Sequence, residues 1–346
     1  MIDNVLLVSC PGFDGGLFLL NGSSSVRLTD RPATGVFVGD KTALFAYQDD
    51  SGKAIRVSRN NSGQDYHLDA EAMDLHDVLV VDGMTYAVAT QTNSVICFDS
   101  DYGRVGSWSL EGEIDSAHLN SIAHYQGKFL VSIFGRFERH RQYKEGTSGK
   151  GEVLDIITGE TFITGLSQPH SLTVVGEYLY MCNSESREVR IYCGTELIDI
   201  IPVPGYARGL VVTGDHIYVG LSASRNTSHS SGGASNAEVC VIDRKSFQVV
   251  GRLGLSCREI YDIRVLNDIK ILTHLIVQPK KSRAEALEEE SHHYKHGYES
   301  YRTGYNFYKS SYESCCKELT VINRSFFWRV CKPFFELEKY ISSKFY

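Results

Sequence analysis

The chain has 346 residues, of which 42% are hydrophobic and 22% are charged, so it can bury a substantial core as one large domain or two modest ones. Its formal net charge of −7 excludes a protein whose main role is to coat nucleic acid, because neutralising phosphates requires a net basic surface. We therefore expect no nucleic-acid partner. No stretch approaches the ~18 consecutive apolar residues of a membrane-spanning helix.

The first ten residues, MIDNVLLVSC, end in a pattern like a lipoprotein processing site before Cys10. However, Asp3 stands where an export signal has a basic residue, and the apolar stretch is shorter than the roughly 7–15 residues that export needs. We expect a first β-strand here. The nine cysteines contain no C-x-x-C pair, and several lie in apolar, strand-like runs, which predicts reduced core thiols in a cytoplasmic protein.

An internal repeat covers most of the chain. Up to about residue 280, short β-rich runs are separated by Gly, Asp and Asn, and six copies of strand, tight turn and second strand recur at intervals of about 38–53 residues. This spacing is typical of four-stranded propeller blades. The copies span residues 32–47, 75–90, 119–134, 169–184, 207–222 and 260–275. We predict an all-β, six-bladed β-propeller over residues 1–279 and a helical tail over residues 280–346.

The two ends of the repeat predict how the ring closes. Residues 4–30 contain three strands without an inner one, and residues 259–266 (EIYDIRVL) provide an inner strand. We expect them to complete one blade together, because this closure removes the exposed sheet edges that a linear array would leave. A seven-bladed ring would require residues 1–30 to form a blade alone, and the pattern favours it less.

The starts of the inner strands should form a ring of polar side chains at one mouth of the propeller. One level contains Ala33, His76, Asn120, His170, Arg208 and Tyr261. The positions two residues earlier, which face the same way because side chains alternate along a strand, are Arg31, Asp74, His118, Gln168, Tyr206 and Glu259. A wet channel is commonly polar, so solvation alone is one explanation. Three histidines with two carboxylates are more than solvation requires.

The chemistry of this ring has two interpretations. Histidine and carboxylate ligands together fit a divalent metal ion, for which zinc, manganese, iron or calcium are the candidates. The same groups fit general acid–base chemistry near neutral pH. No nucleotide cofactor is expected. The predicted catalytic residues are His118, His170, Glu259 and Tyr261, of which His118, His170 and Glu259 are also the predicted metal ligands.

Two long insertions should overhang this mouth. They occupy residues 135–152 and 222–238, between the second and third strands of their blades. The first is rich in basic residues, which favour a carboxylate, phosphate or sulfate, although flexible basic loops are often only solvated. The predicted substrate-binding residues are Arg208, Asn120, His76, Arg139 and Arg141.

Several segments resemble one known family. LLVSCPGFDGGLFLLNG, AHLNSIAHYQGKFLVS, GLSQPHSLTVVGEYLYMCNS, VPGYARGLVVTGDHIYVGLSASR and CREIYDIRVL resemble an uncharacterised bacterial β-propeller family with HLN, PHS, RGL and E-(I/L)-YD blade starts. The resemblance covers about residues 5–268 and implies the propeller fold. It supplies no reaction. In fold alone, the blades are also similar to calcium-dependent lactonases and virginiamycin-type lyases, which hold a metal in the channel.

The tail differs from the blades in composition, because it is rich in charged and aromatic residues. Between residues 287 and 322, tyrosines and apolar residues follow alternating steps of three and four apart from a gap at Ser291, which is a heptad seam. We expect a homo-oligomer formed through residues 287–322. The alternative is that this segment covers the flank of the propeller.

The last segment, residues 324–341, combines aromatic and basic residues. Its W-R-x-x-x-P stretch resembles terminal segments of bacterial glycosyltransferases and methyltransferases of surface-polysaccharide assembly. Aromatic and basic residues together fit a membrane interface or a partner groove, so we expect contact with a glycosyltransferase or with the inner face of the membrane. A helix that docks on its own domain fits equally well.

These observations lead to two hypotheses of function. The first is a propeller of surface-polysaccharide biosynthesis that binds or modifies an anionic sugar at the ring, as a hydrolase, lyase or epimerase. The alternative is a non-catalytic scaffold for glycosyltransferases, with a channel that is merely polar.

Overall fold

The computed structural model describes residues 2–47, 54–59, 62–68, 74–222, 236–272 and 275. The chain divides into one unit of residues 1–278 and a second of residues 279–346, and every described residue belongs to the first. The predicted tail, its heptad seam and its aromatic end therefore lie outside the described residues. The oligomer and the partner contacts assigned to them remain predictions. In the described part of the chain, no helix is long and apolar enough to cross a membrane.

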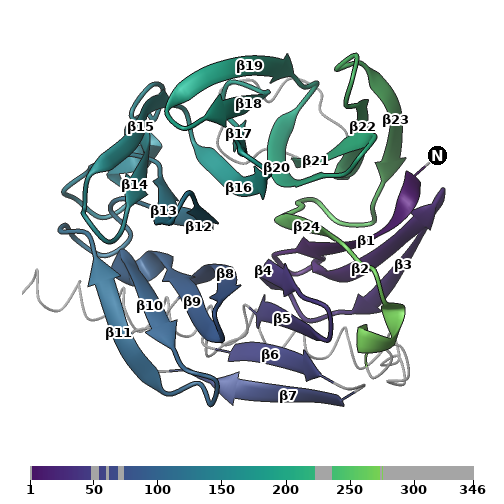
Figure 1. The fold of residues 1–346 in the computed structure, drawn as a ribbon, viewed down its shortest axis with the longest axis horizontal. Helices are drawn as coiled ribbons and strands as arrows, with labels where there is room; N and C mark the ends of the chain where they lie inside the picture. The colour runs from purple at the N-terminus through teal and green to yellow at the C-terminus, as the bar shows by residue number, and fades with distance from the viewer. Residues whose placement is uncertain are drawn as a thin grey trace, which may run out of the picture. The chain divides into compact units, whose positions relative to one another are not determined.

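Six four-stranded antiparallel sheets are arranged in a ring (Figure 1), which confirms the six-bladed propeller. The innermost strands are β4 (Ala33–Val38), β8 (Leu75–Val81), β12 (Leu119–Tyr125), β16 (Pro169–Val175), β20 (Tyr206–Val212) and β24 (Asp262–Val265). The second strands are β5 (Thr42–Tyr47), β9 (Met84–Ala89), β13 (Lys128–Ile133), β17 (Tyr178–Asn183), β21 (His216–Ser222) and β1 (Ile2–Cys10).

The outer half of each blade continues the same order. The third strands are β6 (Ala54–Arg59), β10 (Ser94–Phe98), β14 (Gly151–Asp155), β18 (Glu188–Cys193), β22 (Glu238–Asp243) and β2 (Gly16–Gly22). The outermost strands are β7 (Ser62–His67), β11 (Arg104–Ser109), β15 (Thr161–Leu166), β19 (Glu196–Pro202), β23 (Val249–Gly254) and β3 (Ser24–Thr29). We number the blades 1 to 6 from β4 to β24. Three short 3₁₀ helices are also described: η1 (Thr90–Thr92), η2 (Gln142–Glu145) and η3 (Ile269–Leu272).

Blade 6 closes the ring as the sequence predicts. Strand β24 pairs with β1, from Leu6 opposite Val265 to Ser9 opposite Asp262, so the purple and green ends of the ribbon share one sheet (Figure 1). The expectation that residues 260–275 contain a second strand is wrong. β24 is followed by η3, because β1 already occupies the pairing edge that a second strand would use.

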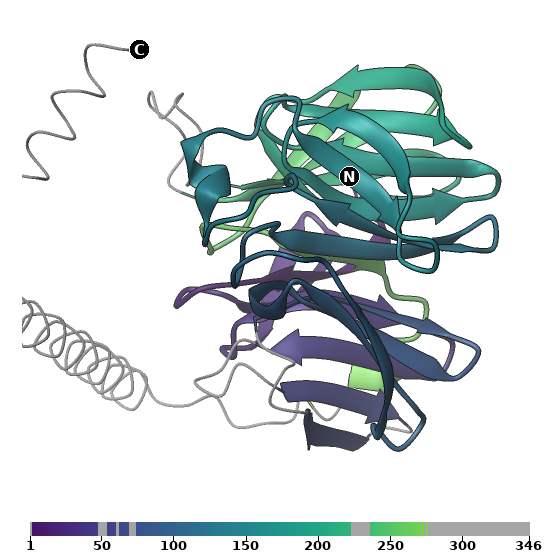
Figure 2. The same ribbon diagram turned by 90° about the vertical axis from the view of Figure 1, so that its left-hand side faces the viewer.

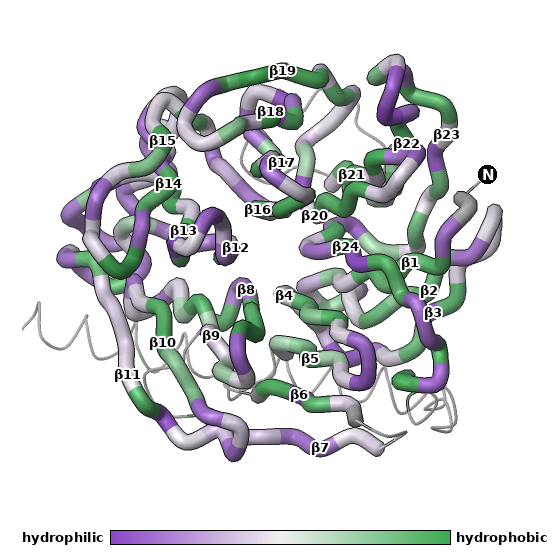
Figure 3. The backbone as a smooth tube through the Cα atoms, viewed as in Figure 1, coloured by the Kyte–Doolittle hydropathy of each residue, from purple (hydrophilic) through white to green (hydrophobic). Residues whose placement is uncertain are grey.

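The core lies between neighbouring blades. Alternate side chains of each strand face opposite neighbours, so each blade packs hydrophobic residues on both sides. Leu44 and Phe98 lie in the cluster between blades 1 and 2, and Tyr125 and Leu179 lie in that between blades 3 and 4. Figure 3 shows the hydrophobic stretches along middle strands such as β5, β6 and β10. The six cysteines among the described residues are free thiols, as predicted for them: Cys10, Cys97, Cys182, Cys193, Cys240 and Cys257.

One repeated position in the inner strands links each blade to the next. In blade 2, Asp77 Oδ2 accepts hydrogen bonds from Ser121 Oγ and from the Ile122 backbone N–H, both at 2.9 Å. Ser121, at the same repeat position of blade 3, accepts from the Leu172 N–H of blade 4 at 2.9 Å. These bonds fix the relative height of three inner strands, and so the geometry of the mouth above them.

The same position continues around the ring. Ser171 Oγ of blade 4 accepts from the Gly209 N–H of blade 5 at 2.9 Å, and Asp262 Oδ2 of blade 6 accepts from the Val36 N–H of blade 1 at 3.1 Å. In blade 1 the strand pairing puts Gly35 at this position, one residue later than the sequence repeat does, and the chain passes very close to blade 2 there. A Cβ atom added to Gly35 would lie 2.4 Å from the Asp77 Cα.

We predict that Gly35→Ala lowers the free energy of unfolding by about 1–3 kcal/mol, because the added methyl group forces the backbones of two blades apart. Urea denaturation would measure it. The matched control is Gly106→Ala in the exposed strand β11, where an added Cβ meets no atom within 4 Å. Equal effects of the two substitutions would show that the contact between blades 1 and 2 is not tight.

Candidate functional site

Three inner strands begin with the same unusual backbone conformation. The residues directly before β8, β12 and β16 are Asp74, His118 and Gln168, with φ angles of 51°, 51° and 54°. This left-handed region is costly for residues other than glycine, and such conformations concentrate at functional sites. The three blades therefore share a constrained turn at which the predicted polar ring begins.

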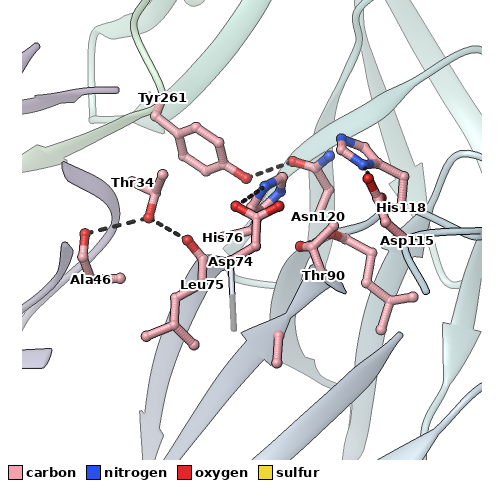
Figure 4. Close-up of polar contacts among 12 residues, drawn as sticks. Thr34, Ala46, Asp74, Leu75, His76, Thr90, Asp115, His118, Asn120 and Tyr261 are labelled. Atoms are coloured by element: carbon pink, nitrogen blue, oxygen red, sulfur yellow. Dashed lines mark hydrogen bonds and ion pairs between the residues drawn. The ribbon is translucent and has the colours of Figure 1, made fainter. Parts of the chain in front are cut away.

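A carboxylate holds the imidazole of His118. His118 Nδ1 lies 2.8 Å from Asp115 Oδ1, as Figure 4 shows. The other oxygen of Asp115 accepts hydrogen bonds from Arg141 Nε at 2.6 Å and from the Tyr143 hydroxyl at 3.0 Å. Burial raises the pKa of Asp115, but its bonds to His118, Arg141 and Tyr143 outweigh burial and bring the pKa below its usual value. Asp115 is therefore an ionised acceptor near neutral pH.

The surroundings of His118 keep its imidazole neutral. Its ring centroid lies 4.4 Å from that of Phe134, 4.5 Å from that of Tyr143 and 5.1 Å from that of His76. Burial lowers the pKa of His118, and the opposing effect of Asp115 does not fully offset it. Because Nδ1 faces a carboxylate, we place the ring proton there, which leaves Nε2 with a lone pair.

His170 has the same tautomer for a different reason. Its Nδ1 lies 2.9 Å from the Gln168 carbonyl oxygen and 2.8 Å from Ser184 Oγ. Ser184 donates its own proton to the Ala207 carbonyl, so it accepts from His170. Burial, followed by the charge of Arg208, lowers the pKa of His170 well below its usual value. The site therefore contains a second neutral imidazole whose Nε2 has a lone pair.

Tyr261 is the centre of a second group of contacts. Its hydroxyl donates to Asn120 Oδ1 at 2.8 Å (Figure 4), and the Arg208 guanidinium carbon lies 4.4 Å from its ring centroid. The His76 ring packs edge-on against the Tyr261 ring, with 5.4 Å between the ring centroids. Arg208 Nη1 also pairs with Glu259 Oε2 at 3.3 Å. Burial raises the pKa of Tyr261 well above its usual value, so its hydroxyl keeps its proton.

These contacts join most of the residues nominated from the sequence. We call the joined set the mouth cluster: His76, His118, Asn120, His170, Arg208, Glu259 and Tyr261. Arg141 reaches it through Asp115. Arg139 does not join it, because its guanidinium pairs with Glu145 at 3.1 Å on the exposed loop. Phe134, which contacts both His118 and His170, links the two imidazoles.

The insertion between β13 and β14 packs against the mouth cluster, as expected for an overhanging loop. It contains η2, and its Arg141 and Tyr143 bond Asp115. Farther along, Thr147 Oγ1 accepts from Gln168 Nε2 at 2.9 Å. Figure 2 shows this teal segment projecting at one side of the propeller. The other insertion lies almost entirely outside the described residues.

The predicted metal ligands have other partners in the structure. Glu259 pairs with Arg208, and both histidines use Nδ1 in hydrogen bonds. Across the described residues, no group of three or more His, Cys, Asp or Glu side chains is placed to hold a metal ion. The metal stays a prediction, which elemental analysis of the purified protein beside a His118→Ala, His170→Ala variant would test.

Sequence reasoning missed Asp115 and Tyr143. Both lie in loops outside the repeat, and their roles depend on a fold that brings residues 115, 118 and 143 together. A weak signal was present for Asp115, since it stands three residues before His118 in DSAH, within reach of a tight turn. Nothing in the sequence marks Tyr143 among the other tyrosines.

Phe134 was missed although the repeat marks it. The equivalent residues of blades 2 and 4 are Thr90 and Ser184, whose hydroxyls donate to backbone carbonyls of the following blade at 2.6 Å. Blade 3 replaces this hydroxyl with an aromatic ring that packs on His118 and His170. The repeat is therefore broken at this position, where ring contacts with two histidines replace a structural hydrogen bond.

Comparisons with solved structures agree with the fold. The chain resembles a protein in a nidogen/laminin complex, with a TM-score of 0.57 at 10% identity over 75% of this chain and 97% of that one. It also resembles a protein of unknown function from Bacteroides caccae, with a TM-score of 0.54 at 12% identity over 77% of this chain and 99% of that one. At these identities the likeness shows the fold alone.

No curated protein matches the chain. One family model, described as a domain of unknown function (DUF4915), matches residues 60–275, which include every member of the mouth cluster. Since this match covers well over half of the chain, the protein belongs to the DUF4915 family.

Proposed function

We propose that the mouth cluster binds and modifies an anionic sugar by acid–base chemistry, with His118 as the general base. The observation that carries the proposal is the Asp115–His118 pair, in which a buried carboxylate holds a neutral imidazole by Nδ1 at 2.8 Å. A carboxylate in this position fixes the tautomer and stabilises the imidazolium that forms when the ring takes a proton. The Nε2 lone pair is the atom that accepts the proton.

The neutral state of His118 supports this role. A base must be unprotonated to act, and burial keeps the pKa of His118 below its usual value. The proton donor in the proposal is Tyr261, whose raised pKa keeps the phenol protonated until a stronger base forms nearby. Arg208 lies against the Tyr261 ring and provides the charge that holds an anionic group.

The charges at the site favour proton abstraction beside a carboxyl group over glycoside hydrolysis. Hydrolysis by the common mechanism needs one protonated carboxylic acid near the glycosidic oxygen. The pKa of Asp115 is lowered, and so is that of Asp74, where the neighbouring His76 and His118 outweigh the effect of burial. Glu259 is paired with Arg208. We therefore favour a lyase or an epimerase acting on a sugar acid.

The place of this activity in surface-polysaccharide assembly is a further part of the proposal. It is supported by the resemblance of residues 324–341 to terminal segments of glycosyltransferases of that pathway. The second candidate, a non-catalytic scaffold for such enzymes, is favoured by the many internal hydrogen bonds of the mouth cluster, since a polar channel needs no substrate.

The test is deuterium exchange into sugar acids. Galacturonate, glucuronate and their oligosaccharides would be incubated with the full-length protein in deuterated water, and loss of the C5 proton signal followed by NMR. We expect exchange with the wild type and with His124→Asn, a control histidine exposed on β12, but not with His118→Asn. Undiminished exchange with His118→Asn would reject His118 as the base. No exchange with any protein would favour the scaffold.

A further inference from the structure

Three buried polar atoms around Tyr261 have no hydrogen-bond partner among the described residues. They are His76 Nδ1, Asn120 Nδ2 and Arg208 Nε, and the described residues contain only one other such atom, Arg27 Nε. His76 and Asn120 are 6% and 1% exposed. Buried polar atoms are almost always paired, so three unpaired atoms around one side chain indicate a site that a ligand completes.

The three atoms differ in hydrogen-bonding role. Asn120 Oδ1 accepts from the Tyr261 hydroxyl, so its Nδ2 is a donor. Arg208 Nε is also a donor, because a guanidinium accepts no hydrogen bond. His76 Nε2 faces Asp74 Oδ1 at 3.4 Å, which places the ring proton on Nε2 and makes Nδ1 an acceptor. The pattern is two donors and one acceptor.

The charges around these atoms limit the charge of the ligand. Arg208 is paired with Glu259, and Arg141 is paired with Asp115. Asp74 adds a further carboxylate beside His76. A dianionic phosphate or sulfate would therefore meet no net positive charge. A monoanion could still be oriented by the guanidinium of Arg208.

We infer that the part of the mouth cluster around Tyr261 is specific for a monoanionic hydroxy acid of the hexuronate class. The carboxylate accepts from Arg208 Nε and Asn120 Nδ2, and a hydroxyl group donates to His76 Nδ1. This inference rests on the proposed function and deepens it, because it names the ligand class and the atoms that select it. A neutral hexose lacks the carboxylate, and a hexose phosphate carries too much charge.

The test is isothermal titration calorimetry of the full-length protein with galacturonate, glucuronate and mannuronate, each beside its neutral hexose and the matching 6-phosphate. We expect at least one hexuronate to bind about tenfold or more tightly than both of its counterparts. Asn120→Asp turns the donor into an acceptor while keeping the partner of Tyr261, and should weaken that binding about tenfold or more. Asn21→Asp, the same change at an exposed position in β2, should leave it unchanged.

Each result decides the inference. It is overturned if no hexuronate binds more tightly than its neutral and phosphorylated counterparts, or if Asn120→Asp behaves like Asn21→Asp. Thermal unfolding of both variants would show that they fold. Selective hexuronate binding without deuterium exchange would keep this inference and reject the acid–base function. Exchange that is insensitive to Asn120→Asp would reject this inference and keep the function.

Discussion

Between pH 5 and pH 7, the free energy of unfolding of the wild type should fall by about 2 kcal/mol relative to that of an Asp262→Asn variant. Asp262 is buried where β24 meets blade 1. Its pKa is raised from 3.8 to about 7, mainly by burial. The charge of Arg264 lowers this pKa, and the charge of Asp77 raises it further. The folded protein therefore favours the protonated form of this carboxyl group, and it loses stability when the group ionises.

The sign follows from proton binding in the two states. Between 3.8 and about 7, Asp262 is protonated in the folded chain and ionised in the unfolded chain, so folding takes up a proton and is weakened as pH rises. The stabilisation is complete below the unfolded pKa and is lost as pH passes through about 7. Buried neutral histidines act in the opposite direction, because the unfolded chain binds their protons more strongly. The comparison with Asp262→Asn cancels that contribution.

Urea denaturation of both proteins at half-unit pH intervals would give the difference. Asn at position 262 still offers an oxygen to the Val36 N–H, so the link between blades 6 and 1 can persist. Asp101→Asn in an exposed turn is the control and should show no such trend. A difference that stays constant from pH 5 to pH 8 would mean that Asp262 is ionised throughout that range in the folded protein.

The propeller could be predicted from the sequence because each blade repeats a local signal. Alternating apolar residues and a Gly or acidic turn mark the inner hairpins. They place His76, Asn120 and His170 at equivalent positions, and His118 at the level two residues earlier. The pairing of β24 with β1 also followed, since each end of the chain lacked the part of a blade that the other supplied. The second strand expected near residue 270 is a 3₁₀ helix instead. The sequence signal does not report which sheet edge is free, and β1 already pairs with β24.

The polar partners within the site could not be predicted in the same way. The contact between Arg208 and Tyr261, and that between Tyr261 and Asn120, join blades 5, 6 and 3, and no local pattern reports contacts across the ring. Arg139 and Arg141 lie two residues apart in one basic loop, but only Arg141 reaches Asp115. Loop conformation, not composition, decides between them.

Replacing Asp115 should slow the reaction strongly, although less than replacing His118. Asp115→Asn removes the charge that holds His118, and we expect the rate of the His118-dependent exchange to fall roughly 10²- to 10⁴-fold. An amide also cannot accept from His118, Arg141 and Tyr143 as a carboxylate does. Tyr143→Phe, which keeps the ring against His118 and removes one bond to Asp115, should reduce the rate less than about tenfold.

The pH dependence of the exchange rate separates a positioning role from a structural one. Asp115 raises the pKa of His118 through its hydrogen bond and charge, although burial dominates and keeps that pKa below its usual value. Without Asp115 the pKa of His118 should fall further, and the acid limb of the pH–rate profile should move to lower pH, because the base acts only when neutral. A variant that is slower but keeps the wild-type acid limb would show that Asp115 only anchors the loop. If the acid limb shifts in Asp115→Asn but not in Tyr143→Phe, the slower exchange is due to the loss of the Asp115–His118 pair.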